Sequence, residues 1–593
     1  MKIYKFRNCL LNTIERSVLM DGKRLDLTPK TFDVLQMLVE RAGEIVTKDE
    51  LLGRVWNGSF VEEGNLPVHV AKLRRQLDGD GNHRFIETVH GGGYRFTANV
   101  EIANEGDWQK QFAGFNRRKS DRQPHQQVLD SIAVLPFRNE TNDAENDYLA
   151  DGLTESVINR LSRTTSLRVM ARDTVFRYKN KDVDAKEVGD TLGVAAVLTG
   201  RIKLIKDNLL VGVELVRVAD RSQLWGKQFD QPFSDIVKIK DAISKAVAEQ
   251  LQPRTANIST TQQTNPVTQN AESYRLYLKG KYFQEKDTEA DLHKAIEYFQ
   301  HSVSHDPENV LSYVEIIESY LALYLFNYLP YGEWSIITGA ILEIAAKLDQ
   351  SVDLLQVVYG GVKLHKEWDF EAAENHLQSA LTLNPNCLRA HIRYSALLLR
   401  IGRFNEALRE LQIVIELDPL SLPPYKLIGR LFYCMGEYEQ TRSYLADALE
   451  MDPEDYVALN VLGAVLTQAG NYEEALEALH KSLSIEYNVE TLSDIGCAQA
   501  LAGKRNAARQ MIKRIEFESK DNHKHPIRLA ELHAALGEKG RAYEFLEQAF
   551  EEHESDLSAL GFNPRWASLR HEPRFIELMK RVGLPTGEKM TAK

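Results

Sequence analysis

One short stretch recurs three times along the chain: ALTLNP at residues 380–385, VIELDP at 414–419 and ALEMDP at 448–453. The same 34-residue spacing separates three glycines, and an aromatic residue follows each of them two positions later: Gly402, Gly436, Gly470, then Phe404, Tyr438, Tyr472. Glycine suits the end of a first helix, and proline stops a second one. One antiparallel helix pair cannot bury its own apolar face. The pattern therefore predicts stacked pairs that form a superhelix with a concave surface.

This period and signature resemble the tetratricopeptide repeat. Weaker copies extend the pattern in both directions, from AIEYFQHSVSHDP at 295–307 to about residue 553. We expect an α-solenoid of roughly seven to nine helix pairs over residues 271–584, followed by a tail at 585–593. A concave groove of this kind suits a protein or peptide partner.

Composition limits what the whole chain can do. The 593 residues are 43% hydrophobic and 27% charged, with a net charge of -12. These values predict a folded protein of about three to six units. Because the chain is acidic, any binding to nucleic acid must come from a local patch. Four scattered cysteines fit a reducing compartment. No signal peptide or membrane span is recognisable, so we expect a cytoplasmic protein without a membrane partner.

Two polar stretches, 99–129 and 253–270, are predicted linkers. Between them, residues 130–252 mix strand and helix patterns, which indicates a compact α/β module. Three of its stretches, IAVLPFRNETND, YLADGLTESVINRLS and LWGKQFD, resemble the TolB-N-terminal-like module. That resemblance implies a fold and a signalling context, and no reaction. The predicted fold class is therefore multidomain and mainly α, with an α+β unit at residues 1–98.

Residues 65–77 within this first unit, NLPVHVAKLRRQL, form the most informative helix pattern. Leu66, Val70, Leu73 and Leu77 make one apolar stripe, while other positions point away from it or flank it: Asn65, Val68, His69, Ala71, Lys72, Arg74, Arg75 and Gln76. An α-helix fits the DNA major groove, where Lys or Arg can donate to guanine and an apolar group can meet a thymine methyl. A solvated charged face is the ordinary alternative. After this helix, IETV, HGGG and YRF predict a hairpin.

Residues 1–98 resemble the OmpR/PhoB-type winged-helix DNA-binding domain almost end to end. The resemblance is carried by LTPKTFDVLQMLVERAGEIVTKDELLGRVW, NLPVHVAKLRRQL and IETVHGGGYRF. It implies base or phosphate contacts for Lys72 and Arg74, an apolar base contact for Val68, and backbone contacts for Trp56, His69, Thr88 and Tyr94. It also places the loop 57–62 where family members touch RNA polymerase.

Two positions depart from this family pattern. His90 stands where many members carry a wing arginine, and Ala71 replaces a position that is often basic. Residues 1–98 hold 15 Lys and Arg against 13 Asp and Glu, a net charge of only +2. We therefore expect modest binding by one copy and tight binding only at paired half-sites, by a homodimer. No phosphorylatable receiver precedes this domain, so we expect the signal to arrive through the rest of the chain.

These observations leave three functional hypotheses. The first is a bacterial transcriptional regulator whose DNA-binding residues are Trp56, Asn65, Val68, His69, Lys72, Arg74, Arg75, Thr88, His90 and Tyr94. The second is a protein-interaction scaffold whose winged helix has lost DNA binding, which the Ala71 and His90 departures favour. The third is an enzyme, because similar α/β modules adjoin nucleotide cyclases, but the sequence contains no Walker A, GxGxxG, HExxH or GxSxG motif and no cyclase catalytic segment. We expect no enzymatic activity, no cofactor and no metal.

Overall fold

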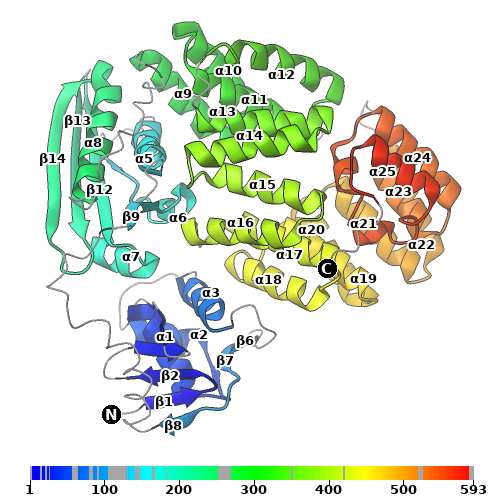
Figure 1. Cartoon of the computed structure of the whole chain (residues 1–593), viewed down its shortest axis with the longest axis horizontal. Coiled ribbons are helices and arrows are strands. Elements are labelled where there is room, and N and C mark those ends of the chain that lie inside the picture. The colour runs from blue at the N-terminus through cyan, green and yellow to red at the C-terminus, as the bar shows by residue number, and fades with distance from the viewer. Residues whose placement is uncertain are drawn as a thin grey trace.

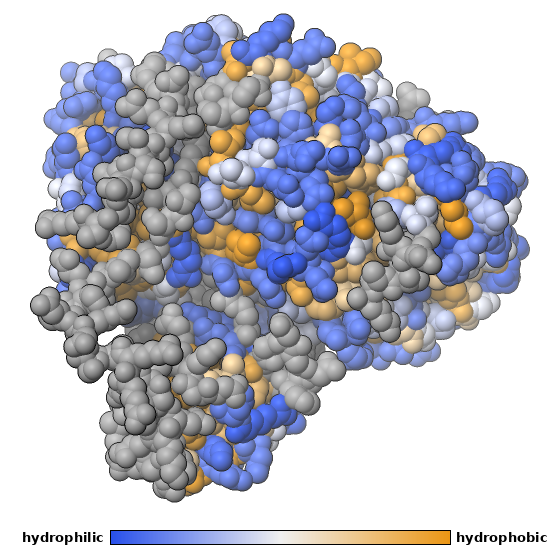
Figure 2. Space-filling model, in the orientation of Figure 1, coloured by the Kyte–Doolittle hydropathy of each residue, from blue (hydrophilic) through white to orange (hydrophobic). Residues whose placement is uncertain are grey.

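The computed structural model shows an N-terminal winged helix below a larger body in which an α/β module adjoins a helical superhelix (Figure 1). It describes residues 3–13, 17–20, 23–25, 27, 29–56, 65–78, 85–89, 92–103, 129, 131–140, 147–162, 167–181, 183–206, 208–251, 268, 270–286, 288–326, 328–348, 352–418, 421–518 and 525–586. Among these residues, no helix combines the length and apolar character needed to cross a membrane. The face in Figure 2 is mostly hydrophilic, with hydrophobic residues in small groups.

The N-terminal unit packs three helices between two small sheets. One sheet has the antiparallel order β4-β3-β2-β1-β8 and the other the order β5-β7-β6. Their bounds are β1 Ile3–Phe6, β2 Cys9–Asn12, β3 Ser17–Met20, β4 Lys23–Arg24, β5 Ile45–Val46, β6 Ile86–Val89, β7 Gly93–Phe96 and β8 Glu101–Ala103. The helices are α1 Pro29–Glu40, α2 Lys48–Trp56 and α3 Asn65–Asp78. Helix α1 thus begins at Pro29, and proline suits the first position of a helix.

The first unit extends past the predicted boundary at residue 98. Strand β8 lies in the stretch 99–129 that the sequence marks as linker, and it pairs with β1 through Tyr4 and Ile102. The polar composition of this stretch does not predict a strand. An edge strand can still form there, because it pairs through its backbone on one side. Ile102 is 74% exposed, so this strand does not need the alternating apolar residues by which a half-buried strand is recognised in a sequence.

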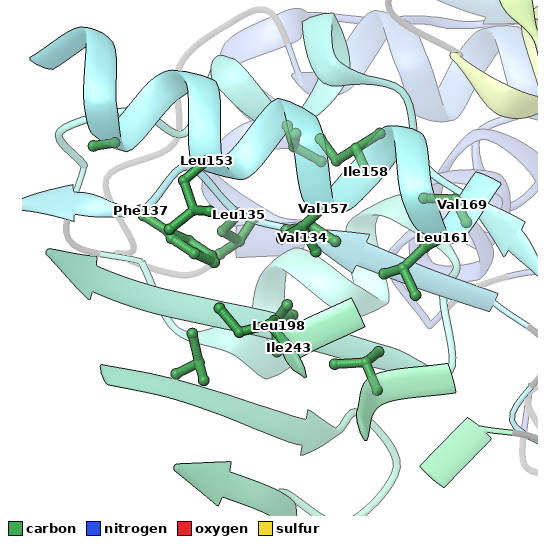
Figure 3. Packing of buried hydrophobic residues seen from close by; sticks show 14 of the residues in the cluster. Val134, Leu135, Phe137, Leu153, Val157, Ile158, Leu161, Val169, Leu198 and Ile243 are labelled. Atoms are coloured by element: carbon green, nitrogen blue, oxygen red, sulfur yellow. The ribbon is translucent and has the colours of Figure 1, made fainter. Parts of the chain in front are cut away.

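The α/β module is a six-stranded sheet covered by helices. The sheet order is β11-β9-β12-β13-β14, and β10 also pairs with β12. The strands are β9 Ser131–Val134, β10 Arg138–Asn139, β11 Arg168–Val169, β12 Ala196–Ile205, β13 Asn208–Arg217 and β14 Gln223–Pro232. The helices are α5 Asp147–Ser162, α6 Arg172–Phe176, α7 Ala185–Leu192, η2 Phe233–Asp235 and α8 Ile236–Leu251. One face of α5 is apolar, and its residues Leu153, Val157 and Leu161 pack toward the sheet (Figure 3).

The superhelix contains eight helix pairs among the described residues, within the predicted range. They are α9 Ala271–Gln284, α10 Glu289–His305, α11 Val310–Leu325, α12 Tyr331–Ala345, α13 Asp353–Val362, α14 Phe370–Leu383, α15 Leu388–Arg400, α16 Phe404–Leu417, α17 Leu422–Met435, α18 Tyr438–Met451, α19 Tyr456–Gln468, α20 Tyr472–Ile485, α21 Val489–Leu501, α22 Arg505–Glu518, α23 Pro526–Ala535 and α24 Lys539–Glu551. Gly402, Gly436 and Gly470 have left-handed φ values of 80°, 77° and 83°, as expected for glycines that end the first helix of a pair.

The α/β module and the first repeats share one hydrophobic core. Residues of α5 and of α9, among them Leu153 and Leu278, belong to the same buried cluster. A Cβ on Gly152 would lie 2.4 Å from the Leu278 side chain, so α5 and α9 are in close contact there. The backbone N–H of Ala171 also donates to the carbonyl of Leu417 at 3.0 Å. The predicted linker at 253–270 therefore does not separate two independent bodies.

A buried carboxylate joins the same elements. Glu315 on α11 is 1% exposed and lies 3.3 Å from both Lys281 on α9 and Arg389 on α15. Lys281 also lies 3.9 Å from Glu155 on α5. Burial alone would raise the pKa of Glu315, but the two cations outweigh it and lower the pKa to about 2. The carboxylate is therefore charged at neutral pH and holds α9, α11 and α15 together.

The C-terminal segment folds back across the superhelix. It comprises the short helices η4 Ser555–Ala559 and η5 Pro564–Trp566 and the helix α25 Pro573–Arg581. Arg400 on α15 donates to Ser558 at 2.9 Å, and Arg565 lies 2.5 Å from Asp494 on α21 and 3.4 Å from Glu531 on α23. Because α15 and α23 are several repeats apart, one short segment can contact both only on the concave side. The expected partner groove is thus partly filled by the chain itself.

We predict that Glu315→Ala lowers the free energy of unfolding by about 3–5 kcal/mol at pH 7, because it leaves Lys281 buried without this partner. Since the folded pKa of Glu315 lies below its usual 4.5, this contribution is present above about pH 4.5 and is lost as the pH falls toward 2. Urea unfolding followed by tryptophan fluorescence measures both effects. Glu343→Ala, which removes an exposed carboxylate from α12, serves as the control. Equal losses in the two variants would contradict the prediction.

Candidate nucleic-acid interface

Helix α3 lies with one side in the core of the N-terminal unit. Leu66, Val70 and Leu73 are fully buried and Leu77 is 3% exposed, which confirms the predicted apolar stripe. The stripe packs with residues of α1 and of the β-strands in a single cluster. Burial of this stripe fixes the rotation of α3 about its axis. Lys72, which lies off the stripe, is therefore not part of this core and is half-buried.

A reciprocal cap fixes the start of α2. The Glu50 backbone N–H donates to Thr47 Oγ1 at 3.2 Å, and the Thr47 backbone N–H donates to Glu50 Oε2 at 2.8 Å. The Thr47 backbone, Arg41 and the Thr47 hydroxyl lower the pKa of Glu50 to about 2. Thr47 and Glu50 together thus form a capping box at this helix start. The cap places Lys48, the first residue of α2, at the helix end nearest to the superhelix contact described below.

Strands β6 and β7 form the predicted hairpin, paired from Ile86 opposite Phe96 to Val89 opposite Gly93. Gly93 has a φ of 124°, and a Cβ at this position would lie 2.1 Å from the carbonyl oxygen of Val46 on β5. Only glycine fits this close approach of two strands. The hairpin is thereby held against β5, and Thr88 and Tyr94 are placed beside α3.

Arg74 connects α3 to the hairpin. Its Nε donates to the carbonyl of Ile86 at 3.1 Å, and its Nη2 donates to Thr88 Oγ1 at 2.6 Å. Two predicted DNA-contacting residues, Arg74 and Thr88, are thus brought together on one surface. Arg74 also has a positioning role, because it ties the helix to the strand that follows it.

His69 differs from the expectation. The sequence places it beside the outward face of α3, but the structure buries it to 1% exposure. Its Nδ1 lies 2.8 Å from Thr31 Oγ1 on α1. The reason is spacing: His69 follows Leu66 by one helical turn and precedes Leu73 by another, so it extends the buried stripe. The predicted exposure of His69 is wrong, and the imidazole supports the packing of α3 on α1.

For the remaining predicted DNA-contacting residues, the structure gives the burial of two side chains and only the backbone position of four others. Lys72 on α3 is half-buried, and Thr88 on β6 is half-buried as well. Trp56 lies at the end of α2, and Asn65, Val68 and Arg75 lie on α3, as their backbone shows. His90 and the loop 57–62 lie outside the described residues.

Helix α18 of the superhelix covers part of this surface. Arg74 Nη1 lies 2.5 Å from Asp447 Oδ1, and Lys48 Nζ lies 3.5 Å from Glu450 Oε1. The Tyr94 hydroxyl donates to the Glu450 carboxylate. Three donors from α2, α3 and β7 thus converge on two carboxylates, and α3 lies beside α18 (Figure 1). Asp447, Glu450 and Lys48 were not predicted as parts of this surface, because no local sequence pattern connects residues so far apart.

The contact is largely closed to solvent. The side chains of Arg74, Asp447 and Glu450 are 11%, 15% and 8% exposed, and Tyr94 is fully buried. Carboxylate oxygens and phosphate oxygens both accept hydrogen bonds from guanidinium, ammonium and phenol groups. The surface is therefore a site for anionic oxygen, and in this structure two carboxylates of the same chain occupy part of it.

Comparison with known families assigns the three parts of the chain. Residues 22–96 match the family described as transcriptional regulatory protein, C terminal. Residues 127–246 match the second domain of HilA/YgeH-like transcriptional regulators, and residues 364–431 and 435–489 match tetratricopeptide repeats. The predicted OmpR/PhoB-type domain and repeats are thereby confirmed, and the middle module is similar to the second domain of HilA-like regulators. Its TolB-like resemblance stays a prediction.

Curated relatives match parts of the chain. The transcriptional regulator HilA of Salmonella typhimurium is 26% identical over 332 residues, which cover 54% of each protein. The response regulator MprA of Mycobacterium avium is 37% identical over 90 residues, 15% of this chain and 40% of MprA. A putative adenylate cyclase 3 of Rhizobium meliloti is 35% identical over 121 residues, 20% of this chain and 21% of the relative. The chain spans about half the length of HilA.

We predict that Gly93→Ala disrupts the hairpin contact with β5, since the added Cβ meets backbone atoms and the φ of 124° strains any other residue. Such strain is of the order of 1–3 kcal/mol. Hydrogen exchange of the amides in residues 86–96 should become faster in this variant. Gly53→Ala is the matched control, because a Cβ on Gly53 in α2 meets nothing within 4 Å. Unchanged exchange in Gly93→Ala would refute the close packing.

Proposed function

We propose that this protein is a sequence-specific DNA-binding transcriptional regulator. The observation that carries the proposal is the placement of α3: its apolar stripe is buried, Arg74 reaches the hairpin at Thr88, and Lys72 lies off the stripe and is half-buried. This is the arrangement that a helix needs to enter a major groove while its neighbours contact the DNA backbone. The match of residues 22–96 to the transcriptional-regulator family supports it.

The charge distribution also favours binding by this unit alone. The whole chain carries a net charge of -12, so a duplex is repelled by most of the protein. The side chains of Arg74 and Lys48 and the Tyr94 hydroxyl gather three hydrogen-bond donors from separate elements onto one surface. The proposed DNA contacts are Lys72 and Arg74 to bases or phosphates, and Thr88 and Tyr94 to the backbone. Trp56, Asn65, Val68, Arg75 and His90 complete the proposed set.

We infer that protein partners act through the superhelix, as its repeats suggest. The segment 555–570 already contacts α15, α21 and α23 on the concave side. A partner peptide would therefore displace this segment or bind the part of the groove that it leaves open. A homodimer on paired half-sites, contact with RNA polymerase through the loop 57–62, and a cytoplasmic location complete the proposal.

The alternative is a protein-interaction scaffold whose winged helix no longer binds DNA. The weak net charge of residues 1–98 and the histidine at position 90 favour it. We propose no catalytic role for the chain. Among its relatives, HilA is named as a transcriptional regulator and MprA as a response regulator, and the relative named as a putative adenylate cyclase matches only 121 residues.

DNA selection tests the proposal with a single charge change. We predict that Lys72→Ala lowers affinity for a duplex selected from a random library and reduces the salt slope by about 1, because one phosphate or base contact is lost. Lys5→Ala is the control, since Lys5 is an exposed lysine on β1. Both variants are compared in the parent chain and in a chain carrying Asp447→Asn and Glu450→Gln, in which α18 no longer presents carboxylates to the winged helix.

The double variant Lys72→Ala/Arg74→Ala distinguishes regulator from scaffold. Selective DNA binding that this variant abolishes supports the regulator. Two outcomes would favour the scaffold over the regulator. In one, neither the parent nor the variant without the α18 carboxylates enriches any duplex. In the other, the double variant binds DNA as its parent does.

A further inference from the structure

We propose that α18 is a built-in competitor of DNA, and that Asp447 and Glu450 hold the winged helix in a closed state of low DNA affinity. The proposal rests on the proposed DNA-binding function. It assigns a docking surface on the superhelix and its occupant, the DNA-contacting surface of the same chain. Three observations support this competition: the chemistry of the contact, the space that a bound duplex would occupy, and the differences between α18 and the equivalent helices of other repeats.

The chemistry of the contact is that of phosphate recognition. Asp447 and Glu450 are three residues apart on α18, so they lie on one face of the helix. They receive Arg74 from α3, Lys48 from α2 and the Tyr94 hydroxyl from β7. Arg74 and Tyr94 are among the residues for which family resemblance implies DNA contacts. Each donor that binds an α18 carboxylate is withdrawn from a phosphate, so the two ligands compete for the same groups.

The geometry also excludes simultaneous binding. Tyr94 is fully buried and the Arg74 side chain is 11% exposed. A major groove is about 12 Å wide and admits a single helix. Because α18 lies beside α3, a duplex that surrounds α3 would have to occupy the space of α18. DNA binding therefore requires the winged helix to leave the superhelix.

The repeats show that superhelix packing does not demand these carboxylates. Helices α14, α16, α18 and α20 follow one another at 34 residues, so their positions can be compared directly. The residues equivalent to Asp447 are Ser379, Ile413 and Lys481, and those equivalent to Glu450 are Thr382, Glu416 and Ser484. All six are exposed, whereas the Glu450 side chain is only 8% exposed. Burial at this position on α18 comes from the winged helix and not from the repeat.

The packing of the repeat core fixes the position of α18 within the superhelix. Leu445 and Ala448 are fully buried in the repeat core, on the side away from the carboxylates. A second contact, between α1 and α7 of the middle module, seats the winged helix on the same body. The closed state thus joins the DNA-binding unit to both other parts of the chain. Its population sets the apparent DNA affinity, because only the open fraction can bind.

The full chain with Asp447→Asn and Glu450→Gln tests the proposal. These substitutions keep the shape of each side chain and remove its charge. Affinity for the selected duplex should rise about tenfold or more over the parent, within the range of coupling energies between sites. Without DNA, the amides of residues 65–78 and 86–96 should exchange faster. The control is Glu473→Gln/Glu474→Gln, which removes two exposed carboxylates from α20 of the next repeat and should change neither measurement.

Exchanging the charges of Lys48 and Glu450 distinguishes loss of this contact from misfolding of the variant. Glu450→Lys alone should open the contact, and the combination with Lys48→Glu should restore slow exchange in residues 86–96, because the pair is re-formed with opposite polarity. Circular dichroism confirms that each variant keeps the parental helix content. Restoration by the second substitution supports a direct contact.

The outcomes separate this proposal from the proposed function. Equal DNA affinity and equal exchange in the parent, the carboxylate variant and the α20 control would overturn the closed state while leaving DNA binding intact. If no variant binds DNA, the regulator proposal fails, and with it the competition between α18 and DNA. Hydrogen exchange then decides only whether the winged helix docks on α18.

Discussion

The stacking of helix pairs, each with an apolar face that only its neighbour can cover, is the constraint on which the rest of the structure depends. Burial of Leu445 and Ala448 in the repeat core fixes the rotation of α18, and that rotation turns Asp447 and Glu450 outward. The first repeats are fixed in the same way against the α/β module, through the buried cluster that α5 and α9 share. The body therefore presents a rigid acidic face to the winged helix, and a contact there has a defined geometry.

The curvature of the superhelix has a second consequence. A curved stack brings its later repeats close to its earlier ones, and the C-terminal segment uses this proximity. Phe562 contacts Gly402 and packs against Phe404 with ring centroids 5.1 Å apart. The ring of His553 stacks between Tyr331 and Trp368, at 4.1 Å and 3.7 Å. Residues His553 and Phe562 thus pack directly against the earlier repeats of the superhelix.

Local sequence patterns predicted most helices and strands, but they could not predict contacts between distant parts of the chain. The stripe of α3 and the glycines of the repeats each depend on neighbours within one or two turns, so spacing alone identifies them. His69 was misplaced because a polar residue at the margin of a stripe can be satisfied by one partner, here Thr31. Arg74 and Asp447 are 373 residues apart, and no periodicity relates them. Strand β8 was missed because its pairing is carried by the backbone.

A weakly basic DNA-binding unit is well suited to control by a competing contact inside the same chain. Residues 1–98 carry a net charge of only +2, so each copy gains little from the general attraction to phosphates. A tethered competitor acts at a high effective concentration, which lets two carboxylates oppose a ligand of far greater charge. A strongly basic unit would overcome such a competitor at any duplex. On the proposal that α18 competes with DNA, a duplex must supply the free energy that opens the chain, and a sequence that adds base contacts supplies more of it than an unselected one. The low charge of this unit is thus no argument against the proposed DNA binding, because it makes selective binding compatible with the proposed closed state.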